Sequence, residues 1–216
     1  MDVFIPREDG STLRCYEVGT RGPGVLLLHP WWGLTEDVMN LADRIAAEGY
    51  RVMAPDLFDG RTADTPEEAE QLVSQADARW DRLVSDAEGA LAQLRDAGVE
   101  RAAAVGLSFG AAYGVILAAQ GAVDALVLYY GTGALEEGAQ VAIPVLGHFA
   151  DEDPYEPDGG EALFEALRES GATTEHYRYP GTSHWFVEPS HSHYRRDAAE
   201  LAWERTLTFL HRTLAG

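Results

Sequence analysis

Lysine is absent from the sequence, so all 16 basic residues are arginine, and 36 acidic residues oppose them. The formal net charge at pH 7 is therefore −20. A chain with this charge repels phosphate backbones and anionic membrane surfaces, which argues against nucleic acid and membranes as partners. The same field disfavours strongly anionic substrates.

Cysteine and long apolar runs are also scarce. Cys15 is the single cysteine, so it cannot form a disulfide within the chain, and we interpret it as a strand residue without chemistry. No apolar run approaches the ~20 residues that a membrane-spanning helix requires. The acidic stretch MDVFIPREDG lacks the basic start and apolar run of a signal peptide. We therefore expect a cytoplasmic protein.

The histidines give little indication of a metal site. His191 and His193 form an H-x-H pair, but no carboxylate or cysteine cluster completes a ligand set around them. We therefore expect neither a metal nor an organic cofactor.

The sequence does contain a regular alternation of apolar runs and amphipathic segments. This pattern predicts an α/β fold, with a mostly parallel sheet covered by helices. A length of 216 residues suits one domain, which we place over residues 1–216. The runs give about eight strands and five or six helices, with a helix capped by Thr35 and either one long or two short helices over 66–97.

Ser108 stands in the pentad Gly106-Leu107-Ser108-Phe109-Gly110, between a strand-like run and a helix-like one. A G-x-S-x-G pentad in this context is typical of a nucleophile elbow, where a strained turn exposes the serine hydroxyl. The small residues Gly106 and Gly110 would let strand and helix approach each other. The alternative is a serine that only caps the following helix.

A serine nucleophile needs a base and an orienting carboxylate, and in this kind of fold they follow in the order Ser, acid, His. The loop after the predicted strand at 141–147 offers Asp151, Glu152 and Asp153, and the loop after 174–179 offers His184. The other histidines fit the base position less well, because they lie at earlier strand ends, inside a strand or on the last helix: His29, His148, His176 and His211.

Four blocks of the sequence resemble blocks of the dienelactone hydrolase family of α/β-hydrolases and occur in that family's order. The resemblance extends over residues 3–214. It implies an α/β-hydrolase fold with a mostly parallel central sheet of about eight strands and helices on both faces. The blocks are HPWWGLTEDVMNLADRIAAEGYRVMAPDLFDG, GLSFGA, HFADEDPYEP and YPGTSHWFVEP.

The resemblance also implies site residues. Position by position, Ser108 matches the family's nucleophile, Asp153 its acid and His184 its base. Asp153 is preferred to Asp151 because the family's acid begins a D-x-x-x-P step, which here ends at Pro157. Asp151 stays the second candidate.

An oxyanion hole is implied at two backbone N–H groups, one from Phe109 and one from the loop after the strand LLLH. Pro30 has no N–H to donate, so we assign the second donor to Trp31. Aromatic residues gather on the loops that would border the site and indicate an apolar pocket suited to acyl or aryl groups. Those assigned to the pocket are Trp32, Phe58, Tyr130, Tyr155 and Trp185.

The chain also departs from the family's best-known members. They use cysteine as nucleophile where this chain has Ser108, and they carry a glutamate where it has Pro30. Members that cleave dienelactones use arginines to hold a substrate carboxylate, one of them shortly after the catalytic histidine, where this chain has Val187 and Glu188. The chain therefore resembles a divergent member.

We predict a serine carboxylesterase or lactonase acting through an acyl-enzyme on small neutral substrates. A second interpretation is a true dienelactone hydrolase of the carboxymethylenebutenolidase type, acting on a carboxylated lactone. A third is a non-catalytic small-molecule receptor on the same fold. We expect the protein to be a monomer or a homodimer.

Overall fold

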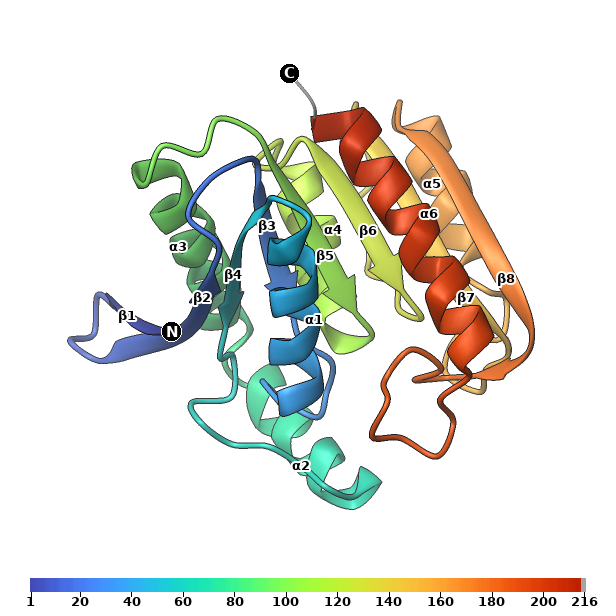
Figure 1. Ribbon diagram of the computed structural model, residues 1–216, viewed down its shortest axis with the longest axis horizontal. Helices are drawn as coiled ribbons and strands as arrows, with labels where there is room; N and C mark the ends of the chain where they lie inside the picture. The colour runs from blue at the N-terminus through green and yellow to red at the C-terminus, as the bar shows by residue number, and fades with distance from the viewer. Residues whose placement is uncertain (215–216) are drawn as a thin grey trace. The chain divides into compact units, whose positions relative to one another are not determined.

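The computed structural model describes residues 1–214, so residues 215–216 of the predicted domain lie outside the described residues. Two compact units are present, one covering Met1–Ala102 and the other starting at Ala103. Within the described residues there are eight strands and six helices (Figure 1), in agreement with the sequence pattern. That the whole chain is one domain stays a prediction.

The strands of the N-terminal unit are ordered β1-β2-β4-β3. The pairs β1–β2 and β2–β4 are antiparallel, whereas β3 and β4 are parallel. Every residue of β3 is buried, as its unbroken apolar sequence predicts. The elements are β1 (Asp2–Pro6), β2 (Thr12–Val18), β3 (Gly24–Leu28), α1 (Glu36–Ala47), β4 (Arg51–Pro55), α2 (Pro66–Asp77) and α3 (Trp80–Asp96).

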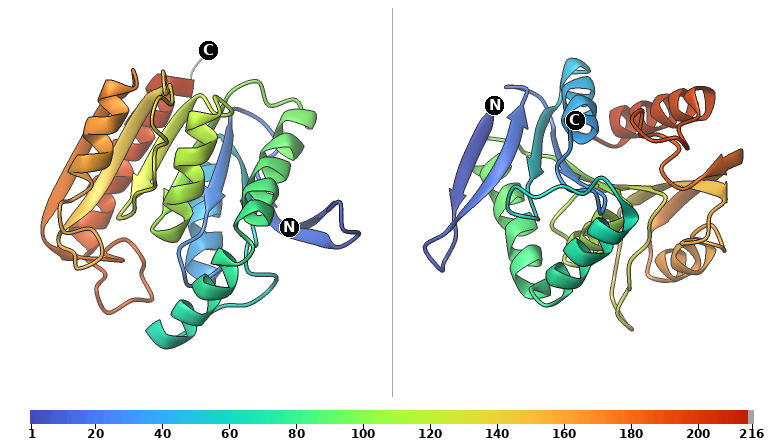
Figure 2. Two further views of the ribbon diagram at one scale, coloured as in Figure 1. Left: turned by 180° about the vertical axis from the view of Figure 1, so that it is seen from behind. Right: turned by 90° about the horizontal axis from the view of Figure 1, so that it is seen from below.

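Helices α1 and α3 lie on opposite faces of these strands (Figure 2). Thr35 is the N-cap residue of α1, as expected, although its side chain makes no capping hydrogen bond within the part of the chain described. Helix α2 has a full capping box, in which the Thr65 side chain accepts from the Glu68 N–H and the Glu68 side chain accepts from the Thr65 N–H. The segment 66–97 thus forms two helices rather than one.

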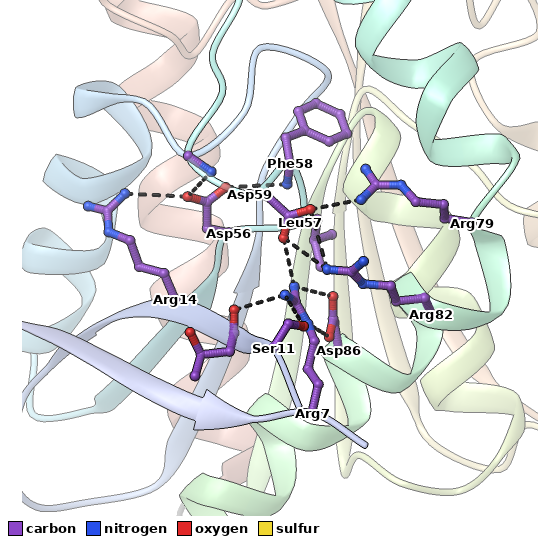
Figure 3. Close-up of polar contacts among 12 residues, drawn as sticks. Arg7, Ser11, Arg14, Asp56, Leu57, Phe58, Asp59, Arg79, Arg82 and Asp86 are labelled. Atoms are coloured by element: carbon purple, nitrogen blue, oxygen red, sulfur yellow. Dashed lines mark hydrogen bonds and ion pairs between the residues drawn. The ribbon is translucent and has the colours of Figure 1, made fainter. Parts of the chain in front are cut away.

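Five charged side chains join the β1–β2 hairpin to α3 (Figure 3). They are Arg7, Asp59, Arg79, Arg82 and Asp86. Arg7 donates from Nε and Nη2 to the two carboxylate oxygens of Asp86, at 2.7 and 2.8 Å. Arg7 also pairs with Asp59 at 3.0 Å, and Asp59 in turn pairs with Arg79 at 2.7 Å and Arg82 at 3.2 Å. Burial alone would raise the pKa of Asp59, but hydrogen bonds from Arg79 and Arg7 bring it below its ordinary value.

Cys15 lies in β2 and is fully buried. Burial, together with the charges of Asp86 and Asp56, raises the pKa of its thiol to about 12. Because the thiolate is the reactive form of cysteine, this side chain is inert at neutral pH. The finding agrees with its interpretation as a packing residue of the strand.

The strands of the C-terminal unit are ordered β5-β6-β7-β8 and pair in parallel. Helix α6 covers one face of them, and α4 and α5 cover the other (Figures 1 and 2). Across the described residues, no helix has the length and apolar character needed to cross a bilayer. The elements are β5 (Ala102–Leu107), α4 (Phe109–Ala119), β6 (Ala125–Tyr129), β7 (Pro144–Glu152), α5 (Glu161–Glu169), β8 (Thr173–Ser183) and α6 (Arg196–Leu214).

A buried chain of hydrogen bonds crosses this unit through His148, in β7. Its Nδ1 lies 2.8 Å from the Tyr179 hydroxyl and its Nε2 lies 2.9 Å from Thr206 Oγ1. Thr206 Oγ1 in turn lies 2.6 Å from the Tyr129 hydroxyl. Burial, with a smaller contribution from the charge of Arg205, lowers the pKa of His148 to about 3. The imidazole is therefore a neutral link between β6, β7, β8 and α6.

Candidate active site

Ser108 occupies the turn between β5 and α4 with φ +46°. A residue with a Cβ is strained in this backbone region. The turn is tight, because a Cβ on Gly106 would stand 2.7 Å from the Ala111 Cα. Ser108 is the N-cap residue of α4, yet its side chain makes no capping hydrogen bond within residues 1–214. The hydroxyl is directed to another partner.

That partner is His184, which follows the C-terminal end of β8. Its Nε2 lies 2.8 Å from Ser108 Oγ, and its Nδ1 lies 2.7 Å from Asp153 Oδ2. With Nδ1 protonated, the imidazole donates a hydrogen bond to the Asp153 carboxylate, and its Nε2 accepts a hydrogen bond from the Ser108 hydroxyl. Three residues from three separate loops thus form one hydrogen-bonded line.

Asp153 lies just after β7 and is 6% exposed. Its Oδ1 accepts the backbone N–H groups of Tyr155 at 3.0 Å and Glu156 at 3.3 Å, which leaves Oδ2 for the imidazole. Asp151 is exposed, and its backbone carbonyl accepts a hydrogen bond from the Arg178 guanidinium. Of the two candidate acids, the structure therefore places Asp153 beside His184.

The model of the dienelactone hydrolase family matches residues 12–214. The chain belongs to the dienelactone hydrolase family. This membership makes it a carboxylic ester hydrolase and supports the α/β-hydrolase fold predicted from the sequence.

Two curated proteins and one solved structure show how similar this member of the dienelactone hydrolase family is to other proteins in sequence and fold. It is 30% identical to a putative carboxymethylenebutenolidase of Azospirillum brasilense, over 96% of each chain. It is 28% identical to the carboxymethylenebutenolidase of Pseudomonas putida, covering 87% of this chain and 85% of that one. A putative dienelactone hydrolase from Klebsiella pneumoniae superposes with a TM-score of 0.80 at 26% identity, over 96% of each chain.

Three predicted pocket residues surround the imidazole of this family member. The ring centroids of Tyr130, Tyr155 and Trp185 each lie 4.9 Å from that of His184. Tyr130 is fully buried, whereas Tyr155 is 51% exposed. Tyr155 is thus the aromatic side chain beside His184 that solvent reaches most easily. Contact of these rings with substrate stays a prediction.

Phe109, the other predicted oxyanion donor, is the first residue of α4 in the C-terminal unit, and the last three predicted site residues of this hydrolase belong to the N-terminal unit. Trp31 and Trp32 follow β3, with ring centroids 5.2 Å apart, and the turn that holds them closes with a hydrogen bond from the Gly33 N–H to the Pro30 carbonyl. Phe58 is fully buried and packs against the ring of His29. Their roles as oxyanion donor and pocket residues stay predictions.

Sequence reasoning missed several contacts around Ser108, His184 and Asp153, most of them one residue removed from these three. The buried carboxylate of Glu188 accepts a 2.8 Å hydrogen bond from the Tyr130 hydroxyl. Thr132 Oγ1 donates to both oxygens of Glu156, at 2.9 and 3.2 Å. A Cβ on Gly131 would stand 2.4 Å from the Ser108 carbonyl oxygen. The sequence signal that could have marked residues 129–133 is the run Tyr-Tyr-Gly-Thr-Gly, which places two glycines at the end of a predicted strand.

The H-x-H pair of His191 and His193 lies against Trp185. Their rings stack on Trp185, with centroids 5.4 and 5.7 Å from the indole. Among residues 1–214, no group of three or more His, Cys, Asp or Glu side chains is arranged to hold a metal ion.

Proposed function

We propose that Ser108, His184 and Asp153 form a catalytic triad that hydrolyses small neutral esters or lactones through an acyl-enzyme. The observation that carries this proposal is the line of two short hydrogen bonds, 2.8 Å from Ser108 Oγ to His184 Nε2 and 2.7 Å from His184 Nδ1 to Asp153 Oδ2. A hydroxyl, an imidazole and a carboxylate in this order have the geometry of nucleophilic acyl transfer.

In the proposed reaction, Ser108 Oγ attacks the ester carbonyl carbon while His184 Nε2 takes the hydroxyl proton. The tetrahedral intermediate collapses when the C–O bond to the alcohol breaks and the imidazolium returns the proton to the leaving oxygen. Water then attacks the acyl-serine with the same imidazole as base, which releases the acid and restores Ser108. Asp153 holds the tautomer with the proton on Nδ1 and stabilises the imidazolium.

The oxyanion of the intermediate needs hydrogen-bond donors. Phe109 is the first residue of α4 and directly follows Ser108, so we assign its backbone N–H as the first donor. The positive end of the helix dipole at this point also favours developing negative charge. We assign the second donor to the backbone N–H of Trp31, in the loop after β3.

A neutral substrate with apolar or aryl groups is supported by charge and by the residues around His184. The net charge of −20 repels anions. The buried carboxylate of Glu188 accepts a hydrogen bond from the hydroxyl of Tyr130, whose ring lies against the imidazole of His184. This carboxylate adds negative charge close to His184. The rings of Tyr130, Tyr155 and Trp185 would contact apolar groups well.

A carboxylated lactone is the second candidate substrate, and the name of the Pseudomonas putida relative, carboxymethylenebutenolidase, favours it. The rates of hydrolysis of a carboxylated dienelactone and its neutral methyl ester separate the two proposals. We expect a higher kcat/KM for the methyl ester, and a clear preference for the acid would select the second candidate.

The triad is tested by Ser108→Ala, with Ser170→Ala as a matched control. Ser170 is a buried serine whose hydroxyl donates to the Leu167 carbonyl. We expect the alanine at 108 to lower kcat on short p-nitrophenyl esters by at least about 10⁴-fold, with the circular dichroism spectrum unchanged. A fluorophosphonate should label Ser108 in the wild-type protein and in Ser170→Ala. Full activity of Ser108→Ala, or labelling at another serine, contradicts the proposal.

A further inference from the structure

The short segment that follows β6 contacts three separate loops of the C-terminal unit. We call it the β6 segment, and it consists of Tyr130, Gly131 and Thr132. Each of its residues touches a different loop. Tyr130 contacts the loop of His184, Gly131 contacts the turn of Ser108, and Thr132 contacts the loop of Asp153. One segment is therefore linked to all three members of the proposed triad.

Gly131 fixes the β6 segment against the turn of Ser108. A Cβ at this position would stand 2.4 Å from the Ser108 carbonyl oxygen and 2.6 Å from its Cα. The last residue of β6 is also joined to this turn, because the Ser108 N–H donates to the Tyr129 carbonyl at 2.9 Å. Any side chain at 131 would push the turn away, so glycine is required by close approach rather than by its φ angle.

Tyr130 links the β6 segment to the loop of His184. Its ring lies edge-on to the imidazole at 4.9 Å, and its hydroxyl donates to Glu188 Oε1 at 2.8 Å. Glu188 is 4% exposed, and its N–H donates to the Trp185 carbonyl, which closes the turn that directly follows His184. The backbone of Tyr130 has φ +36° and is held by a 2.7 Å hydrogen bond from its N–H to the His148 carbonyl.

Thr132 links the β6 segment to the loop of Asp153. Its hydroxyl donates to the Glu156 carboxylate, and the Glu156 N–H donates to Asp153 Oδ1 at 3.3 Å. Burial raises the pKa of Glu156 while the Thr132 hydrogen bond opposes that rise, so this hydroxyl offsets part of the loss of water around the carboxylate. The contact therefore holds the acid loop where Asp153 can reach the imidazole.

We propose that the β6 segment aligns the three loops, with Tyr130–Glu188 and Thr132–Glu156 as its two side-chain links and Gly131 as its backbone contact. Tyr130 and Thr132 are positioning residues: they act on the reaction through His184 and Asp153. This inference rests on the proposed triad. Because a displacement of about 1 Å in a reacting group can reduce a rate about 100-fold, loss of either link should lower turnover.

The test compares Tyr130→Phe and Thr132→Val, each of which removes one hydroxyl and keeps the side-chain shape. We expect kcat on a short p-nitrophenyl ester to fall about 10- to 100-fold for each, with KM changed less than about twofold. The amount of competent enzyme is set by fluorophosphonate titration. We also expect the acid limb of the kcat/KM profile to move to lower pH, because a displaced carboxylate stabilises the imidazolium less.

Three variants control for loss of packing. Thr132→Ser restores the donor and should return both kcat and the pH profile toward wild type. Tyr129→Phe removes the neighbouring buried hydroxyl, which bonds Thr206 instead of an active-site loop. Thr208→Val removes a hydroxyl that donates to the Glu204 carbonyl on the exposed side of α6. Neither of the last two should move the pH profile.

Wild-type kcat and pH profiles in both Tyr130→Phe and Thr132→Val would overturn the inference. An equal shift of the profile in Tyr129→Phe would also overturn it, since the effect would then be one of packing alone. Ser108→Ala keeps this failure separate from that of the triad. Activity that survives in Ser108→Ala refutes the triad itself, whereas an inactive Ser108→Ala with fully active hydroxyl variants refutes only the alignment.

Discussion

Two buried aspartates, one in each unit, show how the same side chain serves different ends. Asp86 in the N-terminal unit is 4% exposed, and Asp153 in the C-terminal unit is 6% exposed. Asp86 accepts two hydrogen bonds from the guanidinium of Arg7, whereas Asp153 accepts an imidazole N–H and two backbone N–H groups. The two side chains are buried to a similar extent, and their hydrogen-bond partners differ.

The difference lies in whether the partner can exchange a proton. Arginine stays charged at any working pH, so the Asp86–Arg7 pair is a fixed link between α3 and the β1–β2 hairpin. An imidazole can take up and release a proton during a reaction, so the interaction of Asp153 with His184 changes when the imidazole is protonated. We infer that Asp86 contributes to stability and that Asp153 contributes to catalysis.

The largest effect that separates the two is expected from Asp153→Asn. An amide at this position keeps the shape of the side chain but favours the His184 tautomer that carries its proton on Nε2. In that tautomer Nε2 cannot accept a hydrogen bond from the Ser108 hydroxyl. We expect kcat to fall about 10³- to 10⁴-fold while the unfolding free energy changes by less than about 1 kcal/mol. Ester hydrolysis and urea unfolding of the same preparation measure both. Wild-type turnover would remove Asp153 from the triad and bring Asp151 back as a candidate.

The matched substitution Asp86→Asn should give the opposite result. It replaces the two carboxylate oxygens that accept from the buried guanidinium of Arg7 with a neutral amide, and within residues 1–214 Asp59 stays as its charged partner. We expect the unfolding free energy to fall by about 2–4 kcal/mol. The kcat per titrated site should stay at the wild-type level. Loss of turnover in folded protein would show that the two aspartates are not functionally distinct.

A third buried group, His148, sharpens the comparison because its side-chain partners are hydroxyls and not a carboxylate. Its pKa falls from 6.5 to about 3 on folding, so the unfolded chain binds the extra proton between these values. The stabilisation is complete above pH 6.5 and is lost as the pH falls toward 3. This residue should add a slope of up to about 1.4 kcal/mol per pH unit.

The slope is measured by urea unfolding between pH 4 and pH 7. His148→Gln keeps hydrogen-bonding atoms near Tyr179 and Thr206 but does not titrate, so its unfolding free energy should depend less on pH. Equal slopes in His148→Gln and the wild-type protein would mean that His148 is not neutral in the fold.

Much of the fold could be predicted because its signals are local. The apolar run of β3, the glycine-flanked pentad around Ser108 and the order of acid and histidine loops are all visible in short stretches of sequence. The break between α2 and α3 was left open, since no proline or glycine marks residues 78–79. The Thr35 position was predicted, but whether its side chain forms the capping bond depends on geometry that sequence does not specify.

The choice between Asp151 and Asp153 shows where local signals end. Both are carboxylates at the C-terminal end of β7, Asp151 within the strand and Asp153 just after it, and an irregularity in the pairing between Ala150 and Glu152 affects which one points inward. The links of the β6 segment were missed for the same reason. Glu188 and Tyr130 are 58 residues apart, and Thr132 and Glu156 are 24 apart, so no spacing rule connects them. Such pairs are determined by tertiary packing alone.

The φ of +46° at Ser108 sets two selective pressures against each other. Glycine would adopt this backbone without strain, whereas serine is destabilised there by on the order of 1 kcal/mol. A lineage selected only for stability would therefore drift toward glycine at this position and lose the hydroxyl. Laboratory evolution for thermal tolerance would favour the same loss unless each round also screened for ester hydrolysis.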